Sequence, residues 1–288
     1  MRCPLPSIVL ILLIQPSKEG DNRLKHLSRE RTLGKISRRE MLEASSILAA
    51  SLAAPNPLKA AQINAGEKPR KLNIVIVGAH PDDPESGCGG TIALYSEQGH
   101  NVTILYLTRG EAGITGNSAH ETAAIRTAES EKACAILRAQ PIFAGQIDGD
   151  TKIDNSRYAD FKKLLAAQNP DIVFTHWPID THRDHRAASL LAYDAWLDSG
   201  RKFDLYYFEV DVGEQTQNFH PTEYVDISAV ESIKKSASFA HVSQQPATTF
   251  WPLHERMMRF RGMECGVENV EAFVRESQNR QTGVPAKE

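Results

Sequence analysis

The chain has 288 residues, a formal net charge of -3 and 41% hydrophobic residues, which is the composition of an ordinary globular protein. The nearly balanced charge gives no electrostatic reason to expect a nucleic-acid partner. The four cysteines are scattered without a Cys-x-x-Cys pair, so the sequence favours neither a disulfide scaffold nor a cysteine-based zinc site. We interpret Cys88 and Cys134 as buried free thiols.

Residues 1–66 have the character of an export leader followed by a linker. The paired Arg38 and Arg39 precede an alanine-rich, mildly apolar run at residues 44–54. This order is typical of a twin-arginine export signal, although Met41 stands where such signals often carry Phe. We therefore predict an exported, periplasmic or extracytoplasmic protein with no membrane span after cleavage. The alternative interpretation is a basic N-terminal arm.

Residues 71–280 are expected to form a single domain in which strands and helices alternate. Strands are predicted at residues 72–78, 102–107, 141–144, 172–175, 205–210 and 223–227. Helices are predicted at residues 89–98, 119–139, 158–167, 187–197, 229–241 and 251–260. Such alternation predicts the α/β class, with a mostly parallel sheet covered on both faces.

Polar side chains follow several of the predicted strands. Because the carboxyl ends of parallel strands meet at one edge of a sheet, His80, Arg109, Asp148 and His176 are expected to converge there. Two His/Asp clusters stand out among these strand ends. Adjacent carboxylates repel each other, so a metal ion is expected beside the first cluster, and the mixed nitrogen and oxygen donors suit zinc. The candidates are His80, Asp82 and Asp83 in the first cluster, and His182, Asp184 and His185 in the second.

The residues of both clusters also have ordinary structural interpretations. His80 could bond the backbone of its loop, and Asp83 and Asp184 could each cap a helix. His176 is interpreted as a structural or supporting residue, and Asp180 as either a turn residue or a support of the site. Spacing alone does not say which histidines or aspartates would bind the metal.

The stretch His80-Pro81-Asp82-Asp83-Pro84-Glu85, together with His182-Arg183-Asp184-His185, resembles the LmbE-like, or PIG-L, family of zinc-dependent N-deacetylases. Members of this family remove acetyl from N-acetylglucosaminyl groups. The resemblance extends from about residue 72 to about residue 245 and includes Arg126 and Glu129. It implies a Rossmann-like three-layer fold with a mostly parallel sheet.

The resemblance also implies a role for each residue of the two clusters. Asp82 would be the general base that takes a proton from the attacking water. His182 would stabilise the oxyanion in its protonated form, and Asp184 would accept a hydrogen bond from it. Three residues would bind Zn2+ and leave a coordination position open, namely His80, Asp83 and His185.

Further residues are predicted to contact the substrate, namely Arg109, Asp148, Glu85 and His241. For Arg109 the alternative is an ion pair with Glu111 or Glu129, and for His241 it is a cation at a helix C-terminus. Arg183 departs from the family pattern, in which many members carry a small residue or Pro, and its charge favours an anionic substrate.

These features predict a zinc-dependent deacetylase that hydrolyses the acetamide of an N-acetylated amino sugar and releases acetate. It would be a hydrolase of carbon–nitrogen bonds other than peptide bonds. Two alternatives remain, a magnesium-dependent hydrolase or phosphoryl-transfer enzyme that uses Asp82 and Asp83, and a catalytically silent sugar-binding protein. The histidines argue against magnesium, which prefers oxygen ligands.

Overall fold

The computed structural model describes residues 70–211 and 213–279 of the chain. The predicted export leader lies outside the described residues, and it stays a prediction. Among the helices that the structure describes, none has both the length and the apolar character that a membrane span requires.

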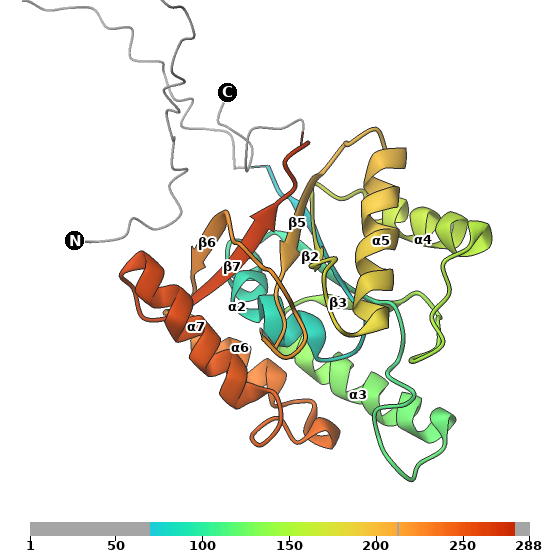
Figure 1. Cartoon of the computed structure of the whole chain (residues 1–288), viewed down its shortest axis with the longest axis horizontal. Helices are drawn as coiled ribbons and strands as arrows, with labels where there is room; N and C mark the ends of the chain where they lie inside the picture. Colours follow the sequence, from blue (N-terminus) through green and yellow to red (C-terminus); the bar gives the residue numbers. More distant parts are fainter. Residues whose placement is uncertain (1–69, 212, 280–288) are drawn as a thin grey trace, which may run out of the picture. The chain divides into compact units, whose positions relative to one another are not determined.

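One seven-stranded sheet organises this part of the chain, in the order β3-β2-β1-β4-β5-β7-β6 (Figure 1). Its first five strands in sequence pair in parallel, whereas β7 pairs antiparallel with both β5 and β6. The predicted mostly parallel sheet is therefore confirmed. The strands are β1 (Asn73–Gly78), β2 (Asn101–Tyr106), β3 (Gln140–Phe143), β4 (Ile172–His176), β5 (Asp204–Phe208), β6 (Glu223–Asp226) and β7 (Val270–Arg275).

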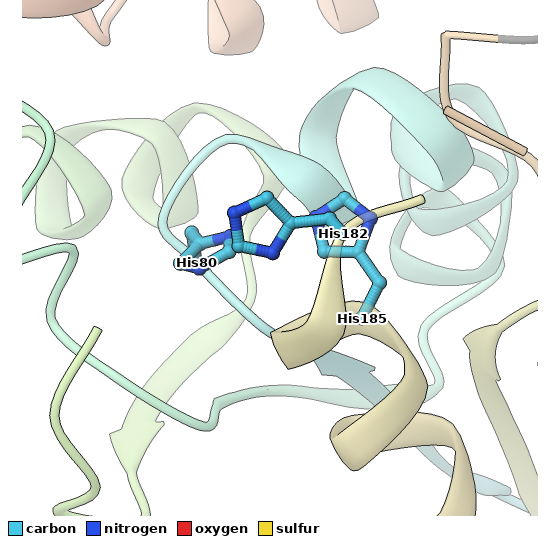
Figure 2. A group of neighbouring side chains, drawn as sticks. All are labelled: His80, His182 and His185. Carbon is cyan, nitrogen blue, oxygen red and sulfur yellow. The ribbon is translucent and has the colours of Figure 1, made fainter. Parts of the chain in front are cut away.

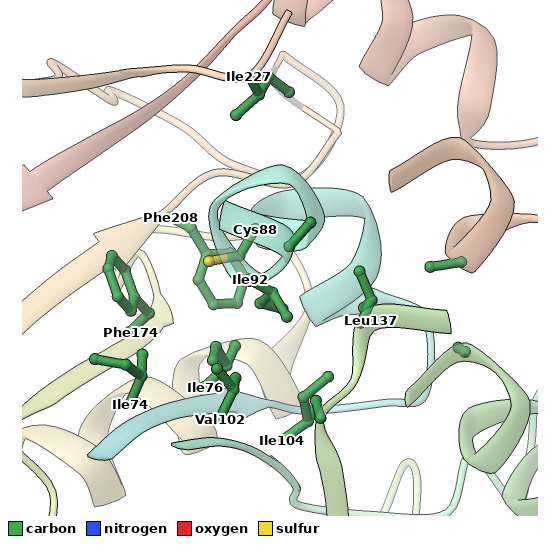
Figure 3. Close-up of a cluster of buried hydrophobic side chains, with 14 of the residues drawn as sticks. Ile74, Ile76, Cys88, Ile92, Val102, Ile104, Leu137, Phe174, Phe208 and Ile227 are labelled. Atoms are coloured by element: carbon green, nitrogen blue, oxygen red, sulfur yellow. The ribbon is translucent and has the colours of Figure 1, made fainter. Parts of the chain in front are cut away.

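Helices cover both faces of the sheet and complete the predicted three layers. One core lies between the sheet and α2, α3, α6 and α7 (Figure 3). The other lies between the sheet and α4 and α5, on the opposite face (Figure 1). The helices are α2 (Asp83–Glu97), α3 (Ala119–Leu137), α4 (Asn155–Ala167), α5 (Arg183–Asp198), α6 (Glu231–Ser238) and α7 (Trp251–Cys265), with a short 3-10 helix, η1 (Val242–Gln244).

Strand β1 shows why the sequence forms two cores. Successive side chains of a strand point to opposite faces, so Ile74 and Ile76 enter the first core while Val75 and Val77 enter the second. A strand buried on both faces needs a continuous apolar run, which β1 has. Cys88 packs in the first core as a buried free thiol, as predicted (Figure 3).

Two elements differ from the sequence prediction. Helix α2 begins at Asp83 instead of residue 89, because its glycines serve close packing and do not mark a loop. A Cβ on Gly90 would lie 2.6 Å from Cγ2 of Ile227, and one on Gly87 would lie 2.6 Å from the Phe208 ring. Strand β7 was not predicted. It brings a buried charge, Glu271, into the interior of the protein.

Candidate active site

The site lies where the strand order reverses, between β1 and β4. In open α/β sheets, the crevice at such a reversal is the usual place for a ligand. Strand β1 leads into His80 and the start of α2, whereas β4 leads through residues 177–182 into α5. The fold therefore brings together the two His/Asp clusters that the sequence predicted to meet.

The carboxylate of Asp83 stands between the two histidines that were predicted to bind metal. One oxygen lies 3.2 Å from Nδ1 of His80, and the other lies 3.3 Å from Nε2 of His185. Figure 2 shows the rings of His80, His182 and His185 close to one another. Their centroids lie 4.7 to 5.4 Å apart. Two imidazole nitrogens and a carboxylate form a donor set that zinc accepts.

The outward-facing nitrogens of both histidines also contact carboxylates. Nε2 of His80 lies 3.2 Å from Asp148 and 3.3 Å from Asp184, and Nδ1 of His185 lies 3.1 Å from Asp180. A carboxylate at the far nitrogen fixes the tautomer and the orientation of an imidazole, and leaves the other nitrogen free to bind metal. The arrangement is thus suited to a cation beside Asp83.

The charges around the site also favour a cation. Burial alone would lower the pKa of His80, but the carboxylates of Asp148, Asp184 and Asp83 raise it well above its usual value. Burial likewise acts to lower the pKa of His185, whereas Asp83 and Asp180 raise it to about 9. Both shifts report an excess of negative charge, which also stabilises a bound metal ion.

Asp82 occupies a strained position directly before α2. Its φ is 109°, a value that non-glycine residues rarely adopt, and it is the N-cap residue of the helix. Nη2 of Arg126 donates to the Asp82 carboxylate at 2.8 Å and also to the carbonyl of Pro81. Burial raises the pKa of Asp82 to about 6, although Arg126 acts to lower it. A carboxylate with a pKa near neutrality is suited to general-base chemistry.

Comparison with known proteins identifies the family. A model of the PIG-L family, described as GlcNAc-PI de-N-acetylase, matches residues 75–196. Diacetylchitobiose deacetylase of Thermococcus kodakarensis is 32% identical over 201 residues, which are 65% of this chain and 74% of that protein. The chain belongs to the PIG-L family of deacetylases. The resemblance to the PIG-L family, which was based on the two His/Asp clusters, is confirmed.

Two further proteins are similar over a large part of this chain. A conserved protein from Thermus thermophilus has a similar fold, with a TM-score of 0.62 and 28% identity, covering 75% of this chain and 97% of that one. A 4-oxalmesaconate hydratase of Pseudomonas putida is 26% identical over 210 residues, which are 66% of this chain and 80% of that protein. Proteins similar to this chain are therefore named for two different reactions, deacetylation and hydration.

In this PIG-L protein, the partners of Asp184 differ from the predicted one. Its carboxylate accepts hydrogen bonds from the Gly149 amide at 2.8 Å and from Oγ1 of Thr151 at 2.6 Å, and it contacts His80. The backbone amide of Asp184 donates to Nδ1 of His182 at 3.3 Å, so His182 caps α5. Asp184 therefore orients His80, and the ring of His182 is held by the helix terminus.

Two predicted substrate-contacting residues are enclosed in this PIG-L structure. Glu85 and His241 are both 0% exposed. Glu85 accepts a hydrogen bond from the Tyr106 hydroxyl at 2.5 Å and lies 3.2 Å from Nε2 of His241. Their contacts support the start of α2 from the interior of the protein, and their predicted contact with substrate stays a prediction.

The two other predicted substrate-contacting residues lie at the site and its rim. Asp148 contacts His80, as described, and also accepts the Ala112 amide at 3.2 Å. Arg109 is exposed, and its guanidinium lies 5.2 Å from the centre of the Phe143 ring. Glu129, a possible ion-pair partner of Arg109, instead accepts hydrogen bonds from the amide and hydroxyl of Ser243.

Two residues that hold the site were not assigned from the sequence. Asp180, for which the sequence predicts either a turn or a support of the site, accepts the His182 amide at 2.7 Å as well as contacting His185. Thr151 was missed, because no local pattern indicates that a threonine after β3 will meet α5. For Asp180 the sequence does contain an indication of this role, because an aspartate two residues before His182 can accept the His182 amide in a turn.

Asp184→Asn is expected to weaken the affinity for added zinc about 10- to 100-fold, the usual effect of a change behind a metal ligand. Asparagine keeps the shape but loses the charge beside His80. Asp150→Asn is the matched control, because Asp150 is exposed in the neighbouring loop. Zinc affinity measured by competition with a chelator tests this, and equal affinities for the two variants would contradict it.

Proposed function

We propose that this PIG-L protein is a zinc-dependent enzyme that hydrolyses the acetamide of an N-acetylated amino sugar of the N-acetylglucosamine type. The observation that carries the proposal is that the Asp83 carboxylate contacts both His80 and His185, beside the strained carboxylate of Asp82. The likeness to a diacetylchitobiose deacetylase supports an amino-sugar substrate. The products would be acetate and a free amine.

His80 Nδ1, the Asp83 carboxylate and His185 Nε2 would hold the zinc ion. When bound, zinc acts as a Lewis acid on a carbonyl oxygen and lowers the pKa of water to about 7. The Asp82 carboxylate takes a proton from the attacking water, and Arg126 holds that carboxylate in place. Asp82 then returns the proton to the leaving amine.

His182, with a neutral imidazole ring, would stabilise the developing oxyanion. Its Nδ1 accepts the Asp184 amide, so a neutral ring carries its proton on Nε2 and can donate from there. Burial lowers the pKa of His182, and the neighbouring His80 and His185 lower it further. This differs from the protonated His182 that the family resemblance implied.

The magnesium alternative finds less support than zinc. Among the described residues three groups have donor atoms close enough to share a metal ion, and each contains at least one histidine: His80 with His182 and His185, Asp83 with His176 and His185, and His80 with Asp148 and Asp184. The three proposed ligands, His80, Asp83 and His185, are distributed over these groups. Imidazole suits zinc, whereas magnesium prefers an all-oxygen shell. A silent sugar-binding protein would have no need of a strained, half-buried Asp82 paired with Arg126.

A second candidate is the addition of water to the double bond of a carboxylated substrate. It is favoured by the likeness to the 4-oxalmesaconate hydratase and by Arg183, an exposed cation next to His182. The deacetylase remains the better supported reaction, because the family description and the relative with higher identity both name it.

The test is acetate release by the purified, zinc-loaded mature protein across N-acetylated sugars, beside hydration of 4-oxalmesaconate. We expect acetate from at least one glucosamine derivative, and none once the metal is removed by a chelator. Hydration without any acetate release would replace the first candidate by the second. Acetate release that persists in magnesium alone would refute zinc dependence.

We also propose that the protein is exported through a twin-arginine signal. Arg38→Lys with Arg39→Lys is expected to leave an uncleaved precursor in the cytoplasm, because such signals depend on the arginine pair. Cell fractionation and the size of the protein measure this. Arg29→Lys with Arg31→Lys is the control, and unchanged export of the Arg38/Arg39 variant would disprove the leader.

A further inference from the structure

A segment after β5 runs beside the loop that carries the histidines into α5. We call residues 213–217 the bracing segment. Its residue Thr216 forms an antiparallel bridge with Asp180. The Thr181 amide donates to the Gln215 carbonyl at 3.1 Å, and the Gln217 amide donates to the Ile179 carbonyl at 2.9 Å. The bracing segment thus fixes the backbone of the loop before His182.

Thr216 is the buried residue of the bracing segment, with 2% of its surface exposed. Its Oγ1 accepts the Val210 amide at 3.0 Å and lies 2.8 Å from the Val210 carbonyl. The single proton of this hydroxyl is shared between the Val210 carbonyl and Oδ2 of Asp180, which lies 3.3 Å away and in turn contacts Nδ1 of His185 at 3.1 Å. One hydroxyl therefore links the end of β5 to the carboxylate behind His185.

We propose that Thr216 is a positioning residue, which holds the Asp180 carboxylate so that the His185 ring presents Nε2 to the metal. The inference rests on the proposed role of His185 as a metal ligand. A carboxylate behind an imidazole sets its tautomer and direction only if the carboxylate is itself held. For Asp180 the His182 amide holds Oδ1, and the Thr216 hydroxyl stands against Oδ2.

The backbone of the bracing segment has its own anchors, so the hydroxyl can be tested separately. The Thr216 amide donates to the Val210 carbonyl at 3.2 Å, and the Gln215 amide donates to the Asp211 carbonyl at 2.8 Å. These bonds do not involve the Thr216 side chain. Thr216→Ser keeps the hydroxyl, whereas Thr216→Val keeps the shape and removes it.

We expect Thr216→Val to weaken zinc affinity about 10- to 100-fold, and Thr216→Ser to remain near the parent. Thr216→Ala, which adds no bulk, is measured in parallel so that poor folding of the valine variant does not decide the result. Glu214→Ala is the control within the bracing segment, because its side chain is exposed. Affinity is measured by chelator competition, and ligand geometry by the absorption spectrum of the cobalt-substituted protein.

The route through Asp180 is tested by combining variants. In an Asp180→Asn background, Thr216→Val should cause no further loss of zinc affinity, because the hydroxyl acts on the metal site through the Asp180 carboxylate. Parent-like affinity and cobalt spectra for both Thr216→Val and Thr216→Ala would overturn the inference, as would equal losses in Thr216→Ser. A parent protein that binds no zinc would instead refute the proposed function.

Discussion

Alanine in place of His80, Asp83 or His185 is expected to remove zinc and activity together. The parent should hold about one zinc per chain, and a site with three protein ligands cannot easily spare one. Elemental analysis of the purified variants gives the zinc content, and acetate release gives the activity. Both quantities should fall to background in each of the three variants.

The variant His176→Ala tests whether His176 belongs to the set of metal ligands. His176 is fully buried and lies 3.3 Å from the Asp83 carboxylate, yet its Nε2 accepts the Ala79 amide at 3.0 Å. That nitrogen is therefore already occupied by a hydrogen bond. Burial lowers the pKa of His176 to about 4, which keeps the ring neutral. We expect the variant to retain zinc while losing stability. Zinc loss in His176→Ala with zinc retained in His80→Ala would show that the ligand set is wrong.

The sequence predicts the fold and the centre of the site because both depend on local patterns. Continuous apolar runs such as β1 indicate strands buried on both faces, and the alternation with helices indicates a parallel sheet. The carboxyl ends of such strands share one edge. His80 and the residues after β4 were therefore expected to meet, and they do so beside Asp83.

The residues that support the site depend on contacts between distant segments, and local patterns do not reveal them. Helix α3 buries Arg126 and Glu129 because they face Asp82 and Ser243, so its buried face does not follow hydrophobic periodicity. Thr151 meets Asp184 only because the loops after β3 and β4 lie side by side.

The glycines of α2 and the strand β7 show a second limit of sequence reasoning. Glycines usually indicate a loop, but those of α2 let the helix approach β5 and Ile227. From the sequence alone, a charged residue such as Glu271 in β7 is expected at the protein surface. It is buried because Lys234 lies 2.6 Å away and the amides of Gly90 and Thr91 donate to it. A buried charge is tolerated only when it is paired in this way.

Asp82→Asn is expected to keep zinc and to lower kcat about 10²- to 10⁴-fold, the usual contribution of a positioned proton acceptor. Asparagine has nearly the same shape and still offers an oxygen to Arg126, but it cannot take the proton from water. Zinc content and kcat, measured beside Asp83→Ala, separate the base from the ligand. Zinc lost in Asp82→Asn and retained in Asp83→Ala would mean that the two roles are reversed.

The pH profile gives this prediction an independent check. Asp82 accepts a proton only when it is ionised, and burial raises its pKa to about 6. In the parent, kcat/KM should therefore fall as the pH drops through about 6, because the protonated carboxyl cannot act as a base. Asp82→Asn has no such group, so its residual activity should lose this acidic limb. An unchanged limb in the variant would assign the titration to another group and remove Asp82 from the role of base.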